Sequence, residues 1–206
     1  MSDPLAAAKL KAETAYNAAA DYFDAEPLAF WARYGRRTVE RLRLRRGAHV
    51  LDVCCGTGAS TLPAAQAVGP EGKVIAVDLA GELLKLGQAK AQAAGLQCME
   101  FRRGDMTDLG FPDGHFDAVV CVFGIFFVPD METQVAELWR MVRPGGQLAI
   151  TTWGARFWSP LCRPYCSGCR GRAPAPLRQS GRCDRRSSRR DSRHSCRRAS
   201  PGVSGR

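Results

Sequence analysis

The chain has 206 residues, of which 45% are hydrophobic and 24% charged, and it carries a formal net charge of +10 together with nine cysteines. This length suits one domain of ordinary size, and the composition excludes a collagen, a coiled coil or a wholly disordered chain. The longest apolar run, residues 119–128, is too short to span a bilayer. Because no secretory signal follows Met1 and the cysteine count is odd, we expect a cytoplasmic protein with reduced thiols.

The positive charge is concentrated at the end of the chain. Residues 161–206 contain 13 Arg, two Asp and neither Lys nor Glu, for a net charge of +11, whereas residues 1–160 have a net charge of −1. The same 46 residues hold five of the nine cysteines and few large apolar side chains, so we expect them to be disordered. The sequence therefore predicts a helical lead-in at 1–45, a folded domain at 46–160 and an Arg/Cys-rich tail at 161–206.

Three explanations compete for this tail. A basic arm such as residues 185–190 could hold RNA or DNA by releasing counterions. Cys162, Cys166 and Cys169 have the spacing of an iron–sulfur signature, but too few residues follow them, and Cys183 lacks the paired spacing of a zinc site. We expect no metal. We favour a third explanation, a gene read out of frame from about residue 160, because the residue types missing from the tail are those with AT-rich codons.

Strands and helices are predicted to alternate through the first 160 residues. Helices are expected at 6–20, 33–44, 60–68, 82–94 and 131–142, and strands at 50–53, 73–78, 98–102, 116–122 and 147–152. Leu138 and Trp139 should lie on the apolar side of the last helix. Residues 143–146, Arg-Pro-Gly-Gly, should end this helix. This order predicts an α/β fold with a doubly wound, mostly parallel sheet that binds its ligand beyond the carboxyl ends of the strands.

Polar residues follow the first three predicted strands where each one ends. The loop at 52–58, Asp-Val-Cys-Cys-Gly-Thr-Gly, provides glycines that let the backbone approach a ligand, and it leads to a helix N-terminus with free N–H groups. Asp78 ends the second strand, where a carboxylate can accept from both hydroxyls of a ribose. Asp105 follows the third strand, where it could accept from an adenine amino group. A tight turn explains the glycines equally well, but three acids at three strand ends favour a ligand site.

These segments, with Phe116-Asp117 and residues 143–146, resemble the class I S-adenosylmethionine-dependent methyltransferases. The closest resemblance is to the small-molecule branch that includes the ubiquinone/menaquinone-biosynthesis methyltransferases (methyltransferase type 11 domain), and it covers residues 15–158. It implies S-adenosylmethionine as the cofactor and a Rossmann-like methyltransferase fold. Such folds normally end with two further strands, so we expect this chain to lack its last two strands.

The resemblance also assigns the cofactor-binding residues. They are Asp52, Gly56, Thr57, Gly58, Asp78, Leu79, Asp105, Met106 and Phe123. It implies that Gly56 and Gly58 pack against the methionine part with Asp52 near its amino group. By the same resemblance Asp78 holds the ribose, and the residues at 105 and 106 flank the adenine. The family usually has a glycine where Cys54 stands in this chain.

Other functions stay open at this point. An NAD(P)-dependent oxidoreductase would share Asp78, but its fingerprint needs a glycine where Thr61 stands. Two further alternatives are a truncated, catalytically impaired methyltransferase-like binding protein and an RNA methyltransferase that uses the basic tail. Methyl transfer is an in-line displacement at an activated sulfonium, which depends mainly on positioning. No general base is evident, because His49 and His115 precede strands and should face solvent at the amino edge of the sheet.

Aromatic side chains follow the fourth and fifth predicted strands. They are Phe123, Phe126, Phe127, Trp153, Phe157 and Trp158. Either they pack the N-terminal helices onto the sheet, or several of them line an apolar pocket for a flat or greasy methyl acceptor. The function expected from the sequence is thus methyl transfer to a small, apolar or aromatic acceptor. We expect neither a nucleic-acid partner nor a membrane span, and the oligomeric state stays open.

Overall fold

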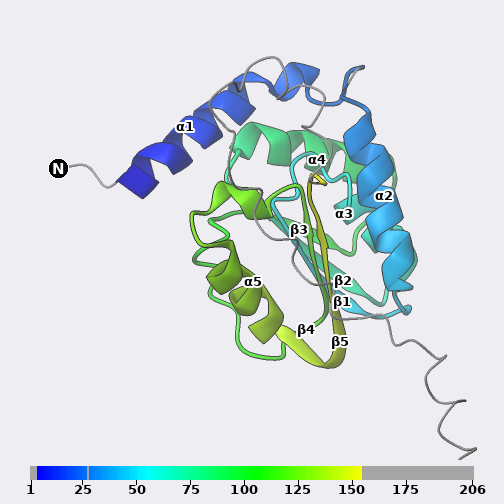
Figure 1. The fold of residues 1–206 in the computed structure, drawn as a ribbon. Helices are drawn as coiled ribbons and strands as arrows, with labels where there is room; N and C mark the ends of the chain where they lie inside the picture. Colours follow the sequence, from blue (N-terminus) through cyan, green and yellow to red (C-terminus); the bar gives the residue numbers. More distant parts are fainter. Residues whose placement is uncertain (1–3, 27, 155–206) are drawn as a thin grey trace, which may run out of the picture. The chain divides into compact units, whose positions relative to one another are not determined.

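A computed structural model describes residues 4–26 and 28–154 (Figure 1), all within one structural unit that spans Met1–Phe157. Several predictions fall on residues 161–206: the disordered tail, the shifted reading frame and the missing last two strands. These predictions lie outside the described residues.

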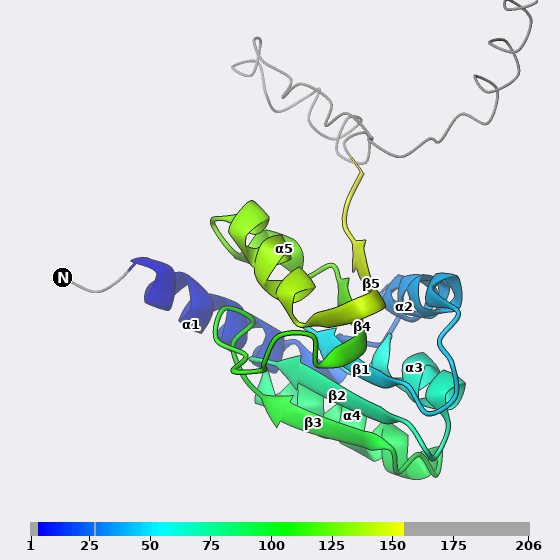
Figure 2. The same ribbon diagram turned by 90° about the horizontal axis from the view of Figure 1, so that it is seen from below.

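Five parallel strands form one sheet in the order β3-β2-β1-β4-β5, as Figure 2 shows. Their bounds are β1 (His49–Val53), β2 (Lys73–Asp78), β3 (Met99–Arg103), β4 (Phe116–Val122) and β5 (Val142–Thr151). The strand order reverses between β1 and β4, and at such a switch point the loops beyond the carboxyl ends separate and leave room for a ligand. The predicted α/β fold with a doubly wound, parallel sheet is confirmed.

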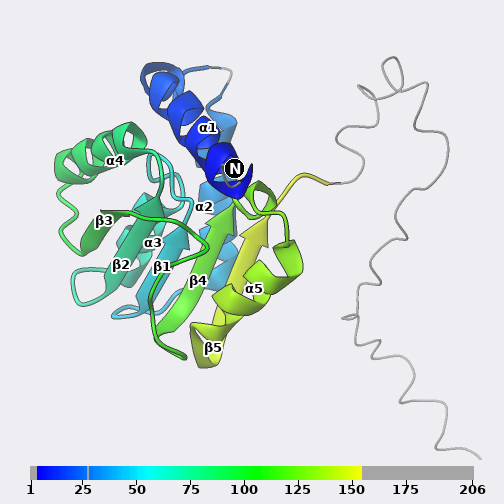
Figure 3. The same ribbon diagram turned by 90° about the vertical axis from the view of Figure 1, so that its left-hand side faces the viewer.

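Helices cover both faces of the sheet. They are α1 (Pro4–Ala18), α2 (Phe30–Leu42), α3 (Thr61–Val68), α4 (Gly81–Ala93) and α5 (Met131–Arg140), with short 3-10 turns η1 (Ala20–Tyr22) and η2 (Ile125–Phe127). In Figure 3, α5 lies in front of the sheet, α2 and α3 lie behind it, and α1 crosses above the arrowheads of the strands. The carboxyl ends of the strands therefore face α1.

Two apolar layers fill the space between the sheet and its helices, and alternate strand residues enter each layer. Leu51 and Val53 of β1 join Leu138 of α5 in one layer. Val50, from the same strand, joins Ala64 of α3 in the other. Residues 50–53 of β1 are buried on both faces, as is typical of a central parallel strand, and the acid among them, Asp52, is fully buried too.

The end of the last described helix differs from the prediction. Helix α5 ends at Arg140, and β5 begins at Val142, so residues 143–146 belong to a strand instead of a turn. Val142 pairs with Phe116, and the register shifts before the next pair, where Gly145 has a φ of 77°. A glycine-containing irregularity thus lets β5 start early. Trp139, expected on the apolar side of α5, is 56% exposed, because the buried side of this shorter helix is centred on Leu138.

Candidate functional site

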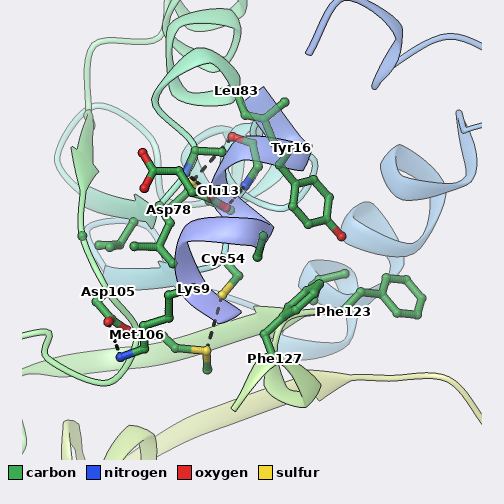
Figure 4. A pocket seen from close by; sticks show the side chains of 18 of the residues that line it. Lys9, Glu13, Tyr16, Cys54, Asp78, Leu83, Asp105, Met106, Phe123 and Phe127 are labelled. Carbon is green, nitrogen blue, oxygen red and sulfur yellow. Dashed lines mark hydrogen bonds and ion pairs between the residues drawn. The ribbon is translucent and has the colours of Figure 1, made fainter. Parts of the chain in front are cut away.

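A cavity of about 280 Å³ lies at the carboxyl ends of the strands, between the strand-end loops and α1 (Figure 4). Six of the nine residues predicted to bind the cofactor line it. They are Gly56, Asp78, Leu79, Asp105, Met106 and Phe123. Helix α1 adds Lys9, Glu13 and Tyr16 from the opposite side. The sheet thus brings together residues from the ends of four predicted strands, at the edge where the sequence indicated a ligand site.

The loop after β1 turns sharply through left-handed backbone conformations. Cys54, Gly56 and Gly58 have φ values of 57°, 55° and 89°. A Cβ at Gly58 would lie 2.3 Å from Leu62 Cδ1, so only glycine fits there without a shift of that side chain. Cys54 adopts the same backbone conformation with a side chain, which explains physically why glycine would suit this position.

Asp78 anchors this loop from the end of β2. Its Oδ2 accepts a hydrogen bond from the Gly56 N–H at 2.9 Å, and its Oδ1 accepts one from the Ala80 N–H at 2.9 Å. Burial raises the pKa of Asp78, and these backbone N–H groups oppose the rise. A carboxylate has about four acceptor positions, so Asp78 can still accept hydrogen bonds from hydroxyl groups in the cavity.

Asp105 is already engaged by α1. Lys9 Nζ lies 2.6 Å from Asp105 Oδ2, and the Thr107 N–H and hydroxyl donate to Oδ1 at 2.8 and 2.9 Å. Although burial opposes it, the hydrogen bonds from Lys9 and Thr107 lower the pKa of Asp105. The side chain predicted to accept from an adenine is therefore an ionised carboxylate paired with a lysine.

Asp52 lies behind the cavity wall and does not line the cavity. It is completely buried, and its Oδ2 accepts hydrogen bonds from the hydroxyls of Ser60 at 2.7 Å and Thr61 at 2.6 Å. Its Oδ1 has no partner among the described residues. Burial raises the pKa of Asp52 to about 6, against the effect of these hydroxyl donors.

Thr57 and Gly58 also stay out of the cavity lining. The Thr57 hydroxyl donates to Asp24 Oδ1 at 2.8 Å, and Asp24 pairs with Lys90 of α4. These contacts fasten the loop after β1 to the segment that follows η1. The role of Thr57 in the structure is therefore to connect two parts of the chain behind the site.

The aromatic residues after β4 divide between the two predicted roles. Phe123 is 6% exposed and packs against Trp31 and Trp153, which fits the packing of α2 onto the sheet. Phe126 and Phe127 are 36% and 43% exposed and line the cavity, as an acceptor pocket would require. Phe157 and Trp158 lie outside the described residues.

The α1 wall was not predicted. Lys9 pairs with Asp105, and Glu13 pairs with Arg103. The ring of Tyr16 points toward Phe127, which it meets edge-on at 5.7 Å between centroids (Figure 4). Burial, followed by the charge of Asp78, raises the pKa of Tyr16. The spacing of residues 9, 13 and 16 on an alanine-rich helix places them on one face, and this pattern is the signal that could have identified them.

Candidate catalytic and metal-binding groups are few elsewhere in the described part of the chain. His49 and His115 are exposed, and Asp117 accepts from the backbone N–H of His49 at 2.8 Å and pairs with Arg143. No group of three or more His, Cys, Asp or Glu side chains that could hold a metal ion occurs within residues 4–26 and 28–154. None of the helices described there is long and apolar enough to cross a membrane.

Comparison with known proteins identifies the family. Residues 14–166 match the ubiE/COQ5 methyltransferase family. The demethylmenaquinone methyltransferase of Listeria welshimeri is 39% identical over 117 residues, which are 57% of this chain and 50% of that protein. The demethylmenaquinone methyltransferase of Geobacillus stearothermophilus is 40% identical over 114 residues, which are 55% of this chain and 49% of that protein. The chain thus spans about half the length of these relatives.

Solved structures agree with this match. The crystal structure of a SAM-dependent methyltransferase from Aquifex aeolicus superposes with a TM-score of 0.57 at 25% identity, over 66% of this chain and 72% of that one. The family match decides between the methyltransferase and oxidoreductase alternatives that the sequence left open. On the extent of this match, the chain belongs to the ubiE/COQ5 methyltransferase family of S-adenosylmethionine-dependent methyltransferases.

Proposed function

We propose that this chain binds S-adenosylmethionine in the cavity beneath α1 and transfers its methyl group to an apolar, ring-bearing acceptor. The observation that carries the proposal is the position of Asp78 beside Gly56, at the switch point of the sheet in a chain of this family. The names of the bacterial relatives indicate the acceptor class, because those proteins act on a demethylmenaquinone. We therefore propose a quinone-type acceptor in its reduced form.

The charge of the cavity suits the donor. S-adenosylmethionine is a net cation, because it carries a sulfonium, an ammonium and one carboxylate group. Of the carboxylates that line the cavity, Asp105 and Glu13 pair with Lys9 and Arg103, which leaves Asp78 without a cationic partner among the described residues. We assign the ribose hydroxyls to the open acceptor positions of Asp78, and the adenine to the space beside Leu79 and Met106. Asp52 lies behind the loop and does not line the cavity, so we assign it no direct contact with the amino group.

The protein contributes position and a dry site. When it is bound, S-adenosylmethionine supplies a methyl group that is already activated on a sulfonium. Holding two reactants in line lowers a barrier by about 7–11 kcal/mol in favourable cases. Phe126 and Phe127 supply an apolar surface on which a flat acceptor can stack, and α1 excludes water. Tyr16, with its raised pKa, stays protonated at neutral pH and can donate a hydrogen bond to an acceptor oxygen.

Calorimetry with S-adenosylhomocysteine tests the cofactor part of this proposal. We expect the full chain to bind it with micromolar affinity, and Asp78→Asn to weaken binding by about 10- to 100-fold, because hydrogen bonds to a charged group are worth about 1.5–3 kcal/mol. Asp108→Asn is the matched control, since this exposed carboxylate lies outside the cavity. A folded chain that gives no binding heat would contradict the proposal.

Transfer of a labelled methyl group from S-adenosylmethionine to a reduced demethylmenaquinone tests the reaction itself. The chain spans about half the length of each relative. This observation favours one alternative function, that of a methyltransferase-like protein that binds the donor without transferring the methyl group. Binding with no transfer to this or other reduced quinones would favour that alternative.

A further inference from the structure

The segment from residue 33 to residue 46 carries a dense positive charge that the proposed reaction does not use. It contains seven arginines and one acid, Glu40, for a net charge of +6, whereas the rest of the described residues have a net charge of −7. The arginines, here called the basic face, are Arg33, Arg36, Arg37, Arg41, Arg43, Arg45 and Arg46, and every one is exposed. A near-neutral body thus has a strongly asymmetric charge distribution.

The helix geometry explains why these side chains share a face. Gly35, Val39 and Leu42 of α2 are buried against the body, so the arginines between them project outward. With a rise of about 1.5 Å per residue, the four arginines from position 33 to position 41 span about 12 Å. The loop that follows continues the row to Arg43 and Arg45, which line a second cavity of about 230 Å³ at the amino edge of the sheet.

The fold does not neutralise this charge. None of the seven arginines forms an ion pair or a side-chain hydrogen bond with another residue of the described ranges. Elsewhere in these ranges the arginines are paired: Arg102 with Glu100, Arg103 with Glu13, and Arg140 with Glu137. Like charges three or four residues apart on a helix repel, so the basic face costs the isolated protein stability. An external anion is the partner that its charge fits.

We infer that the basic face docks the protein on a surface of anionic phospholipids. Guanidinium groups bind phosphate through paired N–H donors and are weakly hydrated, which suits a row of lipid phosphates. A bound single-stranded nucleic acid would need aromatic rings on which its bases stack. Tyr34, the one aromatic residue within 33–46, is 41% exposed and packs edge-on against Phe30 and Phe123, so this segment offers at most one ring to a base.

One end of the basic face, at Arg33, lies near the cavity, and this position supports a lipid surface as well. Trp31, which lines the cavity, precedes Arg33 by two residues on α2. A surface bound along this helix therefore lies close to the rim of the site, where an apolar acceptor would leave the bilayer. The choice of lipid rests in this respect on the proposed function.

Arginine footprinting by phenylglyoxal, read residue by residue by mass spectrometry, tests the inference on the full chain. With vesicles of phosphatidylcholine and phosphatidylglycerol in equal parts, we expect modification of Arg36, Arg37 and Arg41 to slow by about threefold or more, and high salt to abolish this protection. Vesicles of phosphatidylcholine alone should protect none of them. Arg102 and Arg140, which lie on other elements, are internal controls.

Protection must be measured at each arginine separately, because residues 161–206 contain 13 further arginines that could bind vesicles by themselves. Protection confined to residues 185–190, or no protection at all, would overturn the inference. So would an RNA oligonucleotide that protects Arg36 and Arg37 more strongly than the anionic vesicles do.

A triple variant supplies a second measurement. In Arg36→Gln/Arg37→Gln/Arg41→Gln, the vesicles should no longer protect Arg33 and Arg43, whereas binding of S-adenosylhomocysteine should stay unchanged and report an intact fold. Unchanged protection of Arg33 and Arg43 would count against the basic face. Loss of donor binding in the wild-type chain would instead count against the proposed function, so the two failures are distinguishable.

Discussion

A fully buried carboxylate should make the stability of this protein depend on pH in the mildly acidic range. Both hydroxyls that reach Asp52, from Ser60 and Thr61, donate to Oδ2, and Oδ1 has no partner in the described part of the chain. Burial therefore dominates and raises the pKa of Asp52 from 3.8 to about 6. A difference of this size corresponds to about 3 kcal/mol between the charged and neutral forms.

The sign of the effect follows from where the proton binds. The folded state keeps the proton of Asp52 to a higher pH than the unfolded chain does, so stability falls as the pH rises through about 6. The contribution is complete below about pH 4 and absent above about pH 7. Asp52→Asn removes this dependence. Between about pH 4 and 7, we expect the free energy of unfolding of the wild type to fall by about 3 kcal/mol relative to that of Asp52→Asn. Urea unfolding at a series of pH values measures the difference.

Two further variants make this prediction specific. Thr61→Val removes a donor that lowers the pKa of Asp52 in the folded state, so the range over which stability falls should extend to higher pH. Asp117→Asn is the control. Despite burial, the His49 N–H and the Arg143 guanidinium lower the pKa of Asp117, so the difference in stability between this variant and the wild type should vary with pH only in the acid range. If the wild type and Asp52→Asn stay parallel between about pH 4 and 7, the carboxylate is not buried as described.

Three other substitutions test separate parts of the structure. Lys9→Met leaves Asp105 without its ion-pair partner and thus open to the ligand, so affinity for S-adenosylhomocysteine should rise, by at most about fivefold. Weaker binding in calorimetry would show that Lys9 does not compete with the ligand for Asp105. Gly35→Ala places a Cβ 2.4 Å from a backbone oxygen and should cost about 1–3 kcal/mol in urea unfolding, although alanine normally favours a helix; Gly81→Ala, with open space around it, should be neutral or stabilising. Phe127→Ala should raise the KM for a reduced quinone acceptor roughly tenfold and leave donor affinity unchanged. An unchanged KM would show that the acceptor does not bind against Phe127.

The central strands were predictable because local signals agree with the fold. β2 and β4 have the predicted bounds, since each is an apolar run between turn residues and is buried on both faces. The start of β5 was not, because Pro144, Gly145 and Gly146 are typical of a turn. At this edge of the sheet a strand with one neighbour tolerates a proline and an irregular register.

The strand-end wall of the site was likewise accessible to sequence analysis, whereas the α1 wall was not. Gly56 and Asp78 lie at strand ends, where topology alone indicates that they meet. The partner of Lys9 is 96 positions away, at Asp105, and surface ion pairs of this kind leave no periodic pattern in a sequence. Asp52 is a different case, because it lies near the end of the first strand as predicted but is buried, bonded to the hydroxyls of Ser60 and Thr61, and absent from the cavity lining.

The two walls of the cavity also differ in what holds them. The strand-end wall continues into the apolar layers of the sheet, but no described side chain of α1 is fully buried. Helix α1 is held by the pairs Lys9–Asp105 and Glu13–Arg103, by the Asn17 side chain, which accepts from the Glu82 N–H at 3.0 Å, and by the half-buried ring of Tyr16, which packs against Ala80 and Leu83. Exposed ion pairs are worth about 0–1 kcal/mol each and weaken in salt. Salt should therefore weaken these ion pairs well before it affects the sheet, whereas the packing of Tyr16 should persist.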